Sequence, residues 1–187
     1  MSVKDFVQQR RDALIAMRRD FHMYPEPAWL EYRSAAKVAD RLISLGYDVA
    51  LGADVLDLDS RMGLPSDEVM KAAMDRAIKE GANPELVEKM GYGKTAIVAT
   101  MKFGGEGPVV AFRVDMDSND VIEAKEDSHV PTKKGFRSCH DKAMHACGHD
   151  AHMTMGLGLA EYLAAHKDEF KGTIKLIFQP AEEGVRG

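Results

Sequence analysis

The chain has 187 residues, of which 45% are hydrophobic and 29% are charged, and its formal net charge is −5. This composition is sufficient for a globular domain with a buried core. The charges are mixed and form no basic run, so we expect neither a nucleic-acid partner nor a membrane-binding face. No apolar stretch reaches the roughly 20 residues that span a bilayer, and the N-terminus lacks a secretory signal pattern.

The two cysteines, Cys139 and Cys147, are too few for a disulfide framework. Their small number favours a reducing, cytoplasmic location. A disulfide between them is the alternative interpretation. It is the weaker one, because Cys147 stands among residue types that bind metals and Cys139 does not.

The first third of the chain has helical periodicity. Apolar residues at helical spacing predict one helix over 3–22 and a second over 34–45, with Ser34 as the N-cap of the second. A strand over 47–51 follows. Residues 54–91 are then predicted to form a mostly helical insertion.

The pattern changes to short β-rich runs after the insertion. The runs 95–101 and 109–114 are separated by the glycine-rich segment 104–108, which predicts a hairpin. The polar segment 119–144 is long for a loop inside a domain, and such loops tend to carry function.

The last elements are a helix over 149–166 and a nearly continuous apolar strand over 173–178, as expected for a strand that is buried on both faces. Helices that alternate with buried strands favour the α/β class. We therefore predict a three-layer sandwich around a mixed, mostly parallel sheet.

Two clusters of metal-binding residue types follow from this arrangement, since open α/β sheets bind ligands beyond the carboxyl ends of their strands. Asp115 and Asp117 leave a buried strand and point to the same side of an extended chain, although two solvated turn acids would give the same pattern. Cys147 and His149 flank a glycine that permits a tight path, and thiolate and imidazole are preferred zinc ligands. An inert buried cysteine is the alternative, and Asp150 is well placed to orient a ligand.

A third cluster, Glu182 and Glu183, follows the last strand and a proline. Adjacent residues that leave a strand point in different directions, so we expect different roles. One glutamate can bind a metal while the other takes a proton from water. Solvated surface charge is the alternative for an isolated glutamate pair.

These motifs resemble those of a known family. Asp115-Met116-Asp117, Met144 to Asp150 and Gln179 to Gly184 are similar to the three motifs of metal-dependent aminoacylase/carboxypeptidase-type amidohydrolases. The relevant branch includes hippurate hydrolases, auxin-conjugate hydrolases and the A-type chains of aminobenzoyl-glutamate hydrolases. The segment 54–91 fits the last of these best.

The resemblance implies a site of two divalent ions, Mn²⁺ or Zn²⁺. It implies that Cys147, His149 and Glu183 bind metal, that Glu182 is the general base, and that Asp117 is a catalytic acid that supports the metal site. The implied activity is hydrolysis of the amide bond of small N-acyl amino acids, with p-aminobenzoyl-glutamate as the leading substrate. The alternatives are hippurate, other N-acyl amino acids or peptides as substrates, or a non-catalytic metal-binding subunit.

The resemblance also implies that residues 1–187 are the N-terminal portion of the catalytic domain. A smaller lid or dimerisation domain and further ligands would lie outside this chain. We therefore expect the chain alone to be inactive. We also expect it to form an oligomer, either with itself or with a B subunit.

Overall fold

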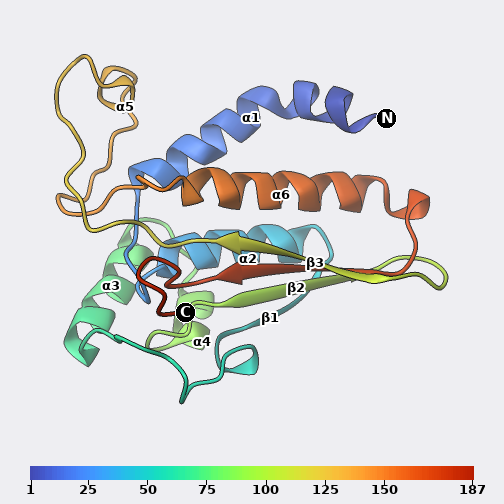
Figure 1. The fold of residues 1–187 in the computed structure, drawn as a ribbon, viewed down its shortest axis with the longest axis horizontal. Coiled ribbons are helices and arrows are strands. Elements are labelled where there is room, and N and C mark those ends of the chain that lie inside the picture. The colour runs from blue at the N-terminus through green and yellow to red at the C-terminus, as the bar shows by residue number, and fades with distance from the viewer.

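Two long helices, α1 and α6, run side by side next to a twisted sheet in the computed structural model, which describes residues 1–187 (Figure 1). The elements in chain order are α1 (Val3–Met23), α2 (Tyr32–Ser44), β1 (Asp48–Leu51), η1 (Gly52–Asp54), α3 (Asp67–Lys79), α4 (Pro84–Met90), β2 (Ile97–Lys102), β3 (Val109–Asp115), α5 (Val130–Lys133), α6 (His149–Ala165), η2 (Lys167–Glu169) and β4 (Thr173–Gln179).

The sheet has four strands in the order β1-β2-β4-β3. The β1–β2 and β2–β4 pairs are antiparallel, and the β3–β4 pair is parallel. The predicted α/β class and mixed sheet are confirmed. Strands β1, β3 and β4 run in the same direction and β2 runs opposite to them, so β3 and β4 are the only parallel neighbours.

The predicted hairpin between β2 and β3 is wrong, because β4 lies between them. The glycine-rich connection instead passes over the start of β4. A Cβ atom on Gly107 would lie 2.8 Å from the backbone nitrogen of Gly172. Phe103 N–H donates to the Gly172 carbonyl at 2.8 Å, and Thr173 N–H donates to the Pro108 carbonyl at 3.0 Å. The glycines are therefore needed because two loops approach each other closely. In the sequence, this requirement has the same appearance as a glycine-rich turn.

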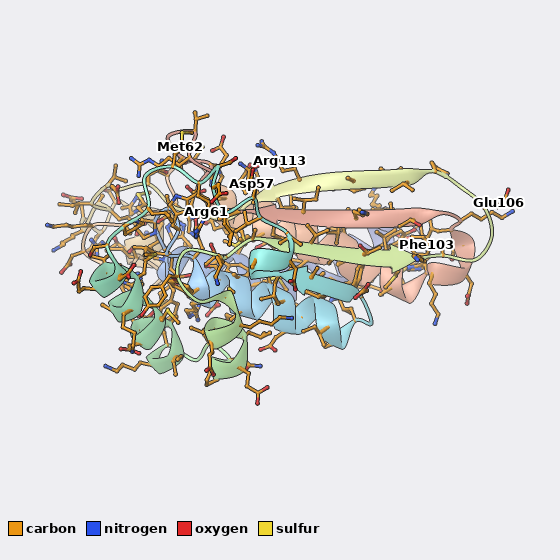
Figure 2. All side chains as sticks on the ribbon, turned by 90° about the horizontal axis from the view of Figure 1, so that it is seen from below. Asp57, Arg61, Met62, Phe103, Glu106 and Arg113 are labelled. Carbon is orange, nitrogen blue, oxygen red and sulfur yellow. The ribbon has the colours of Figure 1, made fainter.

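One face of the sheet is covered by helices. Leu176 and Phe178 of β4 are fully buried on this face, where α6 packs on β3 and β4 and α2 packs on β1 and β2. Figure 2 shows these helices on one side of the strands. Lys175 points away from them and is exposed, so the predicted three-layer arrangement has its helices on a single face here.

The segment 54–91 contains two capped helices. Ser66 accepts from the N–H of Val69 at the start of α3, and Asn83 accepts from the N–H of Glu85 at the start of α4. The predicted helical character is confirmed, while the interpretation of the segment as an insertion stays a prediction.

Helix α2 begins earlier than predicted. The Glu26 carboxylate accepts from the N–H groups of Arg33 and Ser34, at 2.9 and 2.8 Å, so Ser34 lies inside the helix and is not its N-cap. A carboxylate from a neighbouring segment therefore replaces the local cap that the sequence indicated.

Strand β3 forms an exposed edge of the sheet. An apolar groove of about 700 Å³ lies between this edge, α1 and α6, and its lining includes Phe112, Met155 and Tyr162. None of the candidate site residues contributes to the groove. No helix combines the length and the apolar character that crossing a membrane requires.

Candidate metal centre

The three clusters predicted from the sequence meet at one end of the sheet. Strands β3 and β4 are parallel neighbours, so the residues that follow Asp115 and Gln179 leave the sheet at the same edge. Helix α6 begins at His149 beside them. Arg113, which is labelled in Figure 2, marks this end, and Phe103 and Glu106 mark the opposite end.

Three potential ligand atoms converge at this edge. One atom each of Cys147, His149 and Glu183 lie within 4.8 Å of one another. His149 Nε2 is 3.9 Å from Glu183 Oε1 and 3.7 Å from Glu182 Oε2. The structure thus brings both glutamates to the same imidazole nitrogen. The two side chains differ little in exposure, at 35% for Glu182 and 25% for Glu183.

The orientation of His149 leaves Nε2 available. Its Nδ1–H donates to the Asp117 carbonyl at 2.8 Å, and a backbone carbonyl in this position is the usual orienting partner of a metal-binding histidine. The prediction that Asp150 plays this part is wrong. The Asp150 carboxylate instead contacts His22 Nδ1 at 2.7 Å and Arg18 Nε at 2.8 Å.

Two buried carboxylates hold the loop that carries the glutamates. The Asp117 oxygens accept from the N–H groups of Glu182 and Glu183, at 3.1 and 2.9 Å. Glu31 accepts from the N–H of Ala181 at 2.8 Å. Ala181 has a φ of 53°, which is costly for a residue with a Cβ atom, so this conformation persists because three successive N–H groups are fixed from outside the loop.

Glu31 is a residue that sequence reasoning missed. It is fully buried at the start of α2, far from the motifs in sequence, and it also accepts from Thr95 Oγ1 at 2.6 Å. Burial, together with the charge of Asp117, raises the pKa of Glu31 to about 8. The only sequence signal was an acid placed just before an amphipathic helix, which is common at helix N-termini.

The charges at the site favour a cation. Burial opposes protonation of His149, but the hydrogen bonds and charge of Asp117 outweigh it and raise the pKa of the imidazole to about 9. Burial and the hydrogen bond and charge of Glu183 raise the pKa of the Cys147 thiol. Both groups therefore hold protons in response to the surrounding carboxylates, and a bound divalent ion would replace those protons.

Unpartnered oxygen atoms give a second test of this fit. Glu183 Oε1 and Asp115 Oδ1 are buried and have no hydrogen-bond partner. Buried oxygen atoms without a partner are rare unless an ion or a water molecule takes the place of the missing partner. Thiolate, imidazole and carboxylate together form a donor set that suits zinc and related divalent metals, so the residues present fit a metal ion.

A further group of three lies beside the first. Atoms of Asp115, His149 and His152 are within 4.8 Å of one another. The His152 Nδ1 is 3.4 Å from Asp115 Oδ2, and its ring stacks on His149 with the centroids 5.2 Å apart. His145, in contrast, is buried and both of its ring nitrogens lack partners. The structure therefore brings Asp115 and His152 to the site edge and keeps His145 in the protein interior.

The fold and the cluster together define a class, namely an α/β protein with a candidate metal centre at the carboxyl ends of parallel strands. Residues 111–187 match the model of Peptidase family M20/M25/M40. The whole chain also matches two curated relatives at close to half identity.

Two curated relatives show the extent of the likeness. The chain is 48% identical to the A-type chain of p-aminobenzoyl-glutamate hydrolase from Escherichia coli, over 100% of its own length and 43% of the relative. It is 47% identical to the indole-3-acetyl-aspartic acid hydrolase of Enterobacter agglomerans over 99% of its own length and 42% of the relative. The chain thus spans about two fifths of the length of these relatives.

Two solved structures show the same likeness. An aminobenzoyl-glutamate utilization protein from Klebsiella pneumoniae superposes with a TM-score of 0.82 at 41% identity, over 100% of this chain and 40% of that one. A Bacillus subtilis protein described as a dinuclear metal binding peptidase of the M20 family superposes with a TM-score of 0.61 at 30% identity, over 96% and 36% of the two chains.

Proposed function

We propose that the protein is a metal-dependent amidohydrolase that cleaves the amide bond between an acyl group and an amino acid. The observation that carries this proposal is the convergence of Cys147, His149 and Glu183, with Glu182 Oε2 3.7 Å from the same imidazole nitrogen. The match of residues 111–187 to the model of Peptidase family M20/M25/M40 and the names of two relatives support it.

Each residue has a proposed role. Cys147, His149 and Glu183 would hold a divalent ion, which when bound supplies Lewis-acid polarisation of the amide carbonyl and acidifies water. Glu182, the less buried of the two glutamates, would take a proton from the attacking water and pass it to the leaving amine. Asp117 would position both glutamates, since its two oxygens accept their backbone N–H groups.

The proposed substrate is p-aminobenzoyl-glutamate, with indole-3-acetyl-aspartate as the second candidate. The names of the two relatives share an acyl group that contains an aromatic ring and an acidic amino acid. We therefore propose an aromatic acyl conjugate of glutamate or aspartate as the substrate class, with hippurate and other N-acyl amino acids as poorer substrates.

We propose that the site binds a pair of divalent ions, Mn²⁺ or Zn²⁺. A neighbour described as dinuclear supports the pair. The Escherichia coli relative is named as one subunit of its enzyme, which supports assembly with a second, B-type chain. Thiolate ligation requires an unpaired Cys147, and both cysteines are free, which supports the reducing cytoplasm as the proposed location.

The test uses the full-length protein that contains this chain, stripped of metal and reloaded with Mn²⁺ or Zn²⁺. Hydrolysis of p-aminobenzoyl-glutamate, p-aminobenzoyl-glutamine and hippurate is measured beside metal content. We expect metal-dependent turnover that is fastest with the glutamate conjugate. Stoichiometric metal without turnover on any conjugate would favour a non-catalytic metal-binding subunit. Turnover by the metal-free protein would reject the proposal.

A further inference from the structure

A second group of potential ligands lies outside the centre described above. Atoms of Glu80, Cys139 and His140 lie within 4.8 Å of one another. Glu80 is the C-cap of α3, and the other two residues belong to the long connection between β3 and α6. None of the three belongs to the clusters assigned to the amidohydrolase site.

The backbone fixes this group in place. Cys139 N–H donates to the Met23 carbonyl at 2.9 Å, and the carbonyl of Glu80 accepts from Arg33 Nε at 3.1 Å. His140 Nδ1 is 2.7 Å from the Pro25 carbonyl. A carbonyl oxygen can only accept, so Nδ1 carries the hydrogen, and in a neutral imidazole the lone pair is then on Nε2.

That lone pair faces another acceptor. His140 Nε2 is 2.8 Å from Glu80 Oε1, and two acceptors at this distance repel each other unless a proton or a cation lies between them. A proton on His140 would satisfy this contact alone. It would leave Glu80 Oε2 buried without a partner, and it gives no reason for the thiol beside the pair.

A bound cation accounts for all three groups. One ligand atom each of Cys139, His140 and Glu80 can contact the same ion, since these atoms lie within 4.8 Å of one another. Arg33 and Arg76 are the positive charges near Cys139. Arg33 is already paired with both oxygens of Asp20. The remaining positive charge of Arg76 opposes a cation, but one thiolate and one carboxylate would neutralise a divalent ion within the site.

We propose that Glu80, Cys139 and His140 form a second metal site that takes a soft or borderline divalent ion such as Zn²⁺. Three protein ligands leave a fourth position for water. A pocket lined by His140, Arg76 and Asp141 opens this side of the group to solvent. The ion would join the end of α3 to the connection that leads into the Met144–His149 motif. The proposal is independent of the amidohydrolase assignment.

The test separates the two sites with Co²⁺ as the probe, because a cobalt–thiolate bond gives a charge-transfer absorption band. The Cys147→Ala/Glu183→Ala double variant removes the thiol and one carboxylate of the first site. We expect this variant to bind Co²⁺ with a thiolate band. Adding Cys139→Ser should abolish the band, and adding His140→Gln should weaken binding by more than the roughly 10–100-fold that loss of an outer-shell partner costs.

His166→Gln is the matched control for His140→Gln, since the His166 ring contacts only the Tyr162 carbonyl and nearby aromatic rings, and it should leave the band unchanged. If the double variant does not fold, zinc content is measured in the wild type and in Cys139→Ser alone, which should differ by one equivalent. A thiolate band that survives Cys139→Ser, a double variant that folds and gives no band, or equal zinc content in the second comparison would overturn the proposal.

Discussion

The two ligand groups differ in how they are built. At the first, Asp117 and Glu183 follow two neighbouring strands and lie at one end of the sheet. Buried carboxylates accept hydrogen bonds from the backbone N–H groups of the loop that carries Glu183. At the second, a helix end and a connecting loop bring Glu80 beside His140, which lies 60 residues away in sequence. Both groups orient a histidine through Nδ1 and a backbone carbonyl. The same hydrogen bond therefore orients His149, which lies in a sequence motif, and His140, which belongs to no motif.

The two groups also differ in charge. Four acids, Asp115, Asp117, Glu182 and Glu183, surround His149 directly or through its neighbours. The group at His140 has one acid and a nearby arginine. An excess of negative charge therefore favours cation binding at the first group more than at the second.

The largest expected effect comes from Glu182→Gln, which keeps the shape of the side chain and removes its basicity. If Glu182 is the general base, kcat should fall by at least the ~10²–10⁴-fold typical of general-base loss, with metal content unchanged. Steady-state kinetics and elemental analysis on the full-length protein measure both. Glu169→Gln, in the exposed η2 turn, is the control. Loss of metal with unchanged turnover per bound ion would mean that Glu182 and Glu183 have exchanged roles.

Cys147→Ala tests the ligand set that the sequence motif predicts. Removing the thiolate should strip most of the metal from the first group and abolish most activity, while the fold stays intact because the Cys147 side chain is exposed. Circular dichroism and elemental analysis check the two parts. Met155→Ala is the control, since it changes another exposed residue, on α6. It should change neither the metal content nor the fold. Unchanged metal stoichiometry in Cys147→Ala would contradict the assignment.

His145 makes the stability of the protein depend on pH on the acidic side of neutrality. Burial lowers the pKa of His145 to about 4 from its ordinary 6.5. The folded state therefore binds fewer protons than the unfolded state between these values, so its stability is complete above pH 6.5 and is lost as the pH falls toward 4. The free energy of unfolding should fall by up to about 3 kcal/mol across this range.

Denaturant unfolding of the metal-free protein at a series of pH values measures this slope. The His145→Met variant removes the titrating group and keeps an apolar side chain in its place. The free energy of unfolding of this variant should fall less steeply with decreasing pH than that of the wild type, because the contribution of His145 is absent. Parallel slopes for the two proteins would show that His145 is not the source.

The smallest expected effect is that of Asp117→Asn, which replaces one acceptor oxygen by a donor facing the N–H of Glu182 or Glu183. Leaving that N–H unpaired should cost about 1–3 kcal/mol of stability, and metal affinity should fall roughly 10–100-fold. Asp168→Asn, an exposed carboxylate in η2, is the control. A variant that keeps full metal affinity would show that the loop does not depend on Asp117.

Local chemistry determined much of this protein from the sequence alone. Apolar periodicity located α1 and α6 to within a few residues, and the buried strand β4 was evident from its unbroken apolar run. The positions of the three clusters beside predicted elements also indicated that they lie at one end of the sheet. The choice of Cys147, His149 and Glu183 as the ligands came from the family resemblance.

Tertiary structure decided the rest, since it depends on contacts between distant residues. Strand order is one example: β4 separates β2 from β3, and no local signal distinguishes the glycines of that connection from a hairpin turn. Glu31 and Glu26 act on backbone N–H groups that packing brings to them. Cys139 has its ligand-like neighbour Glu80 only because α3 ends against the loop, and that approach is a property of the folded chain.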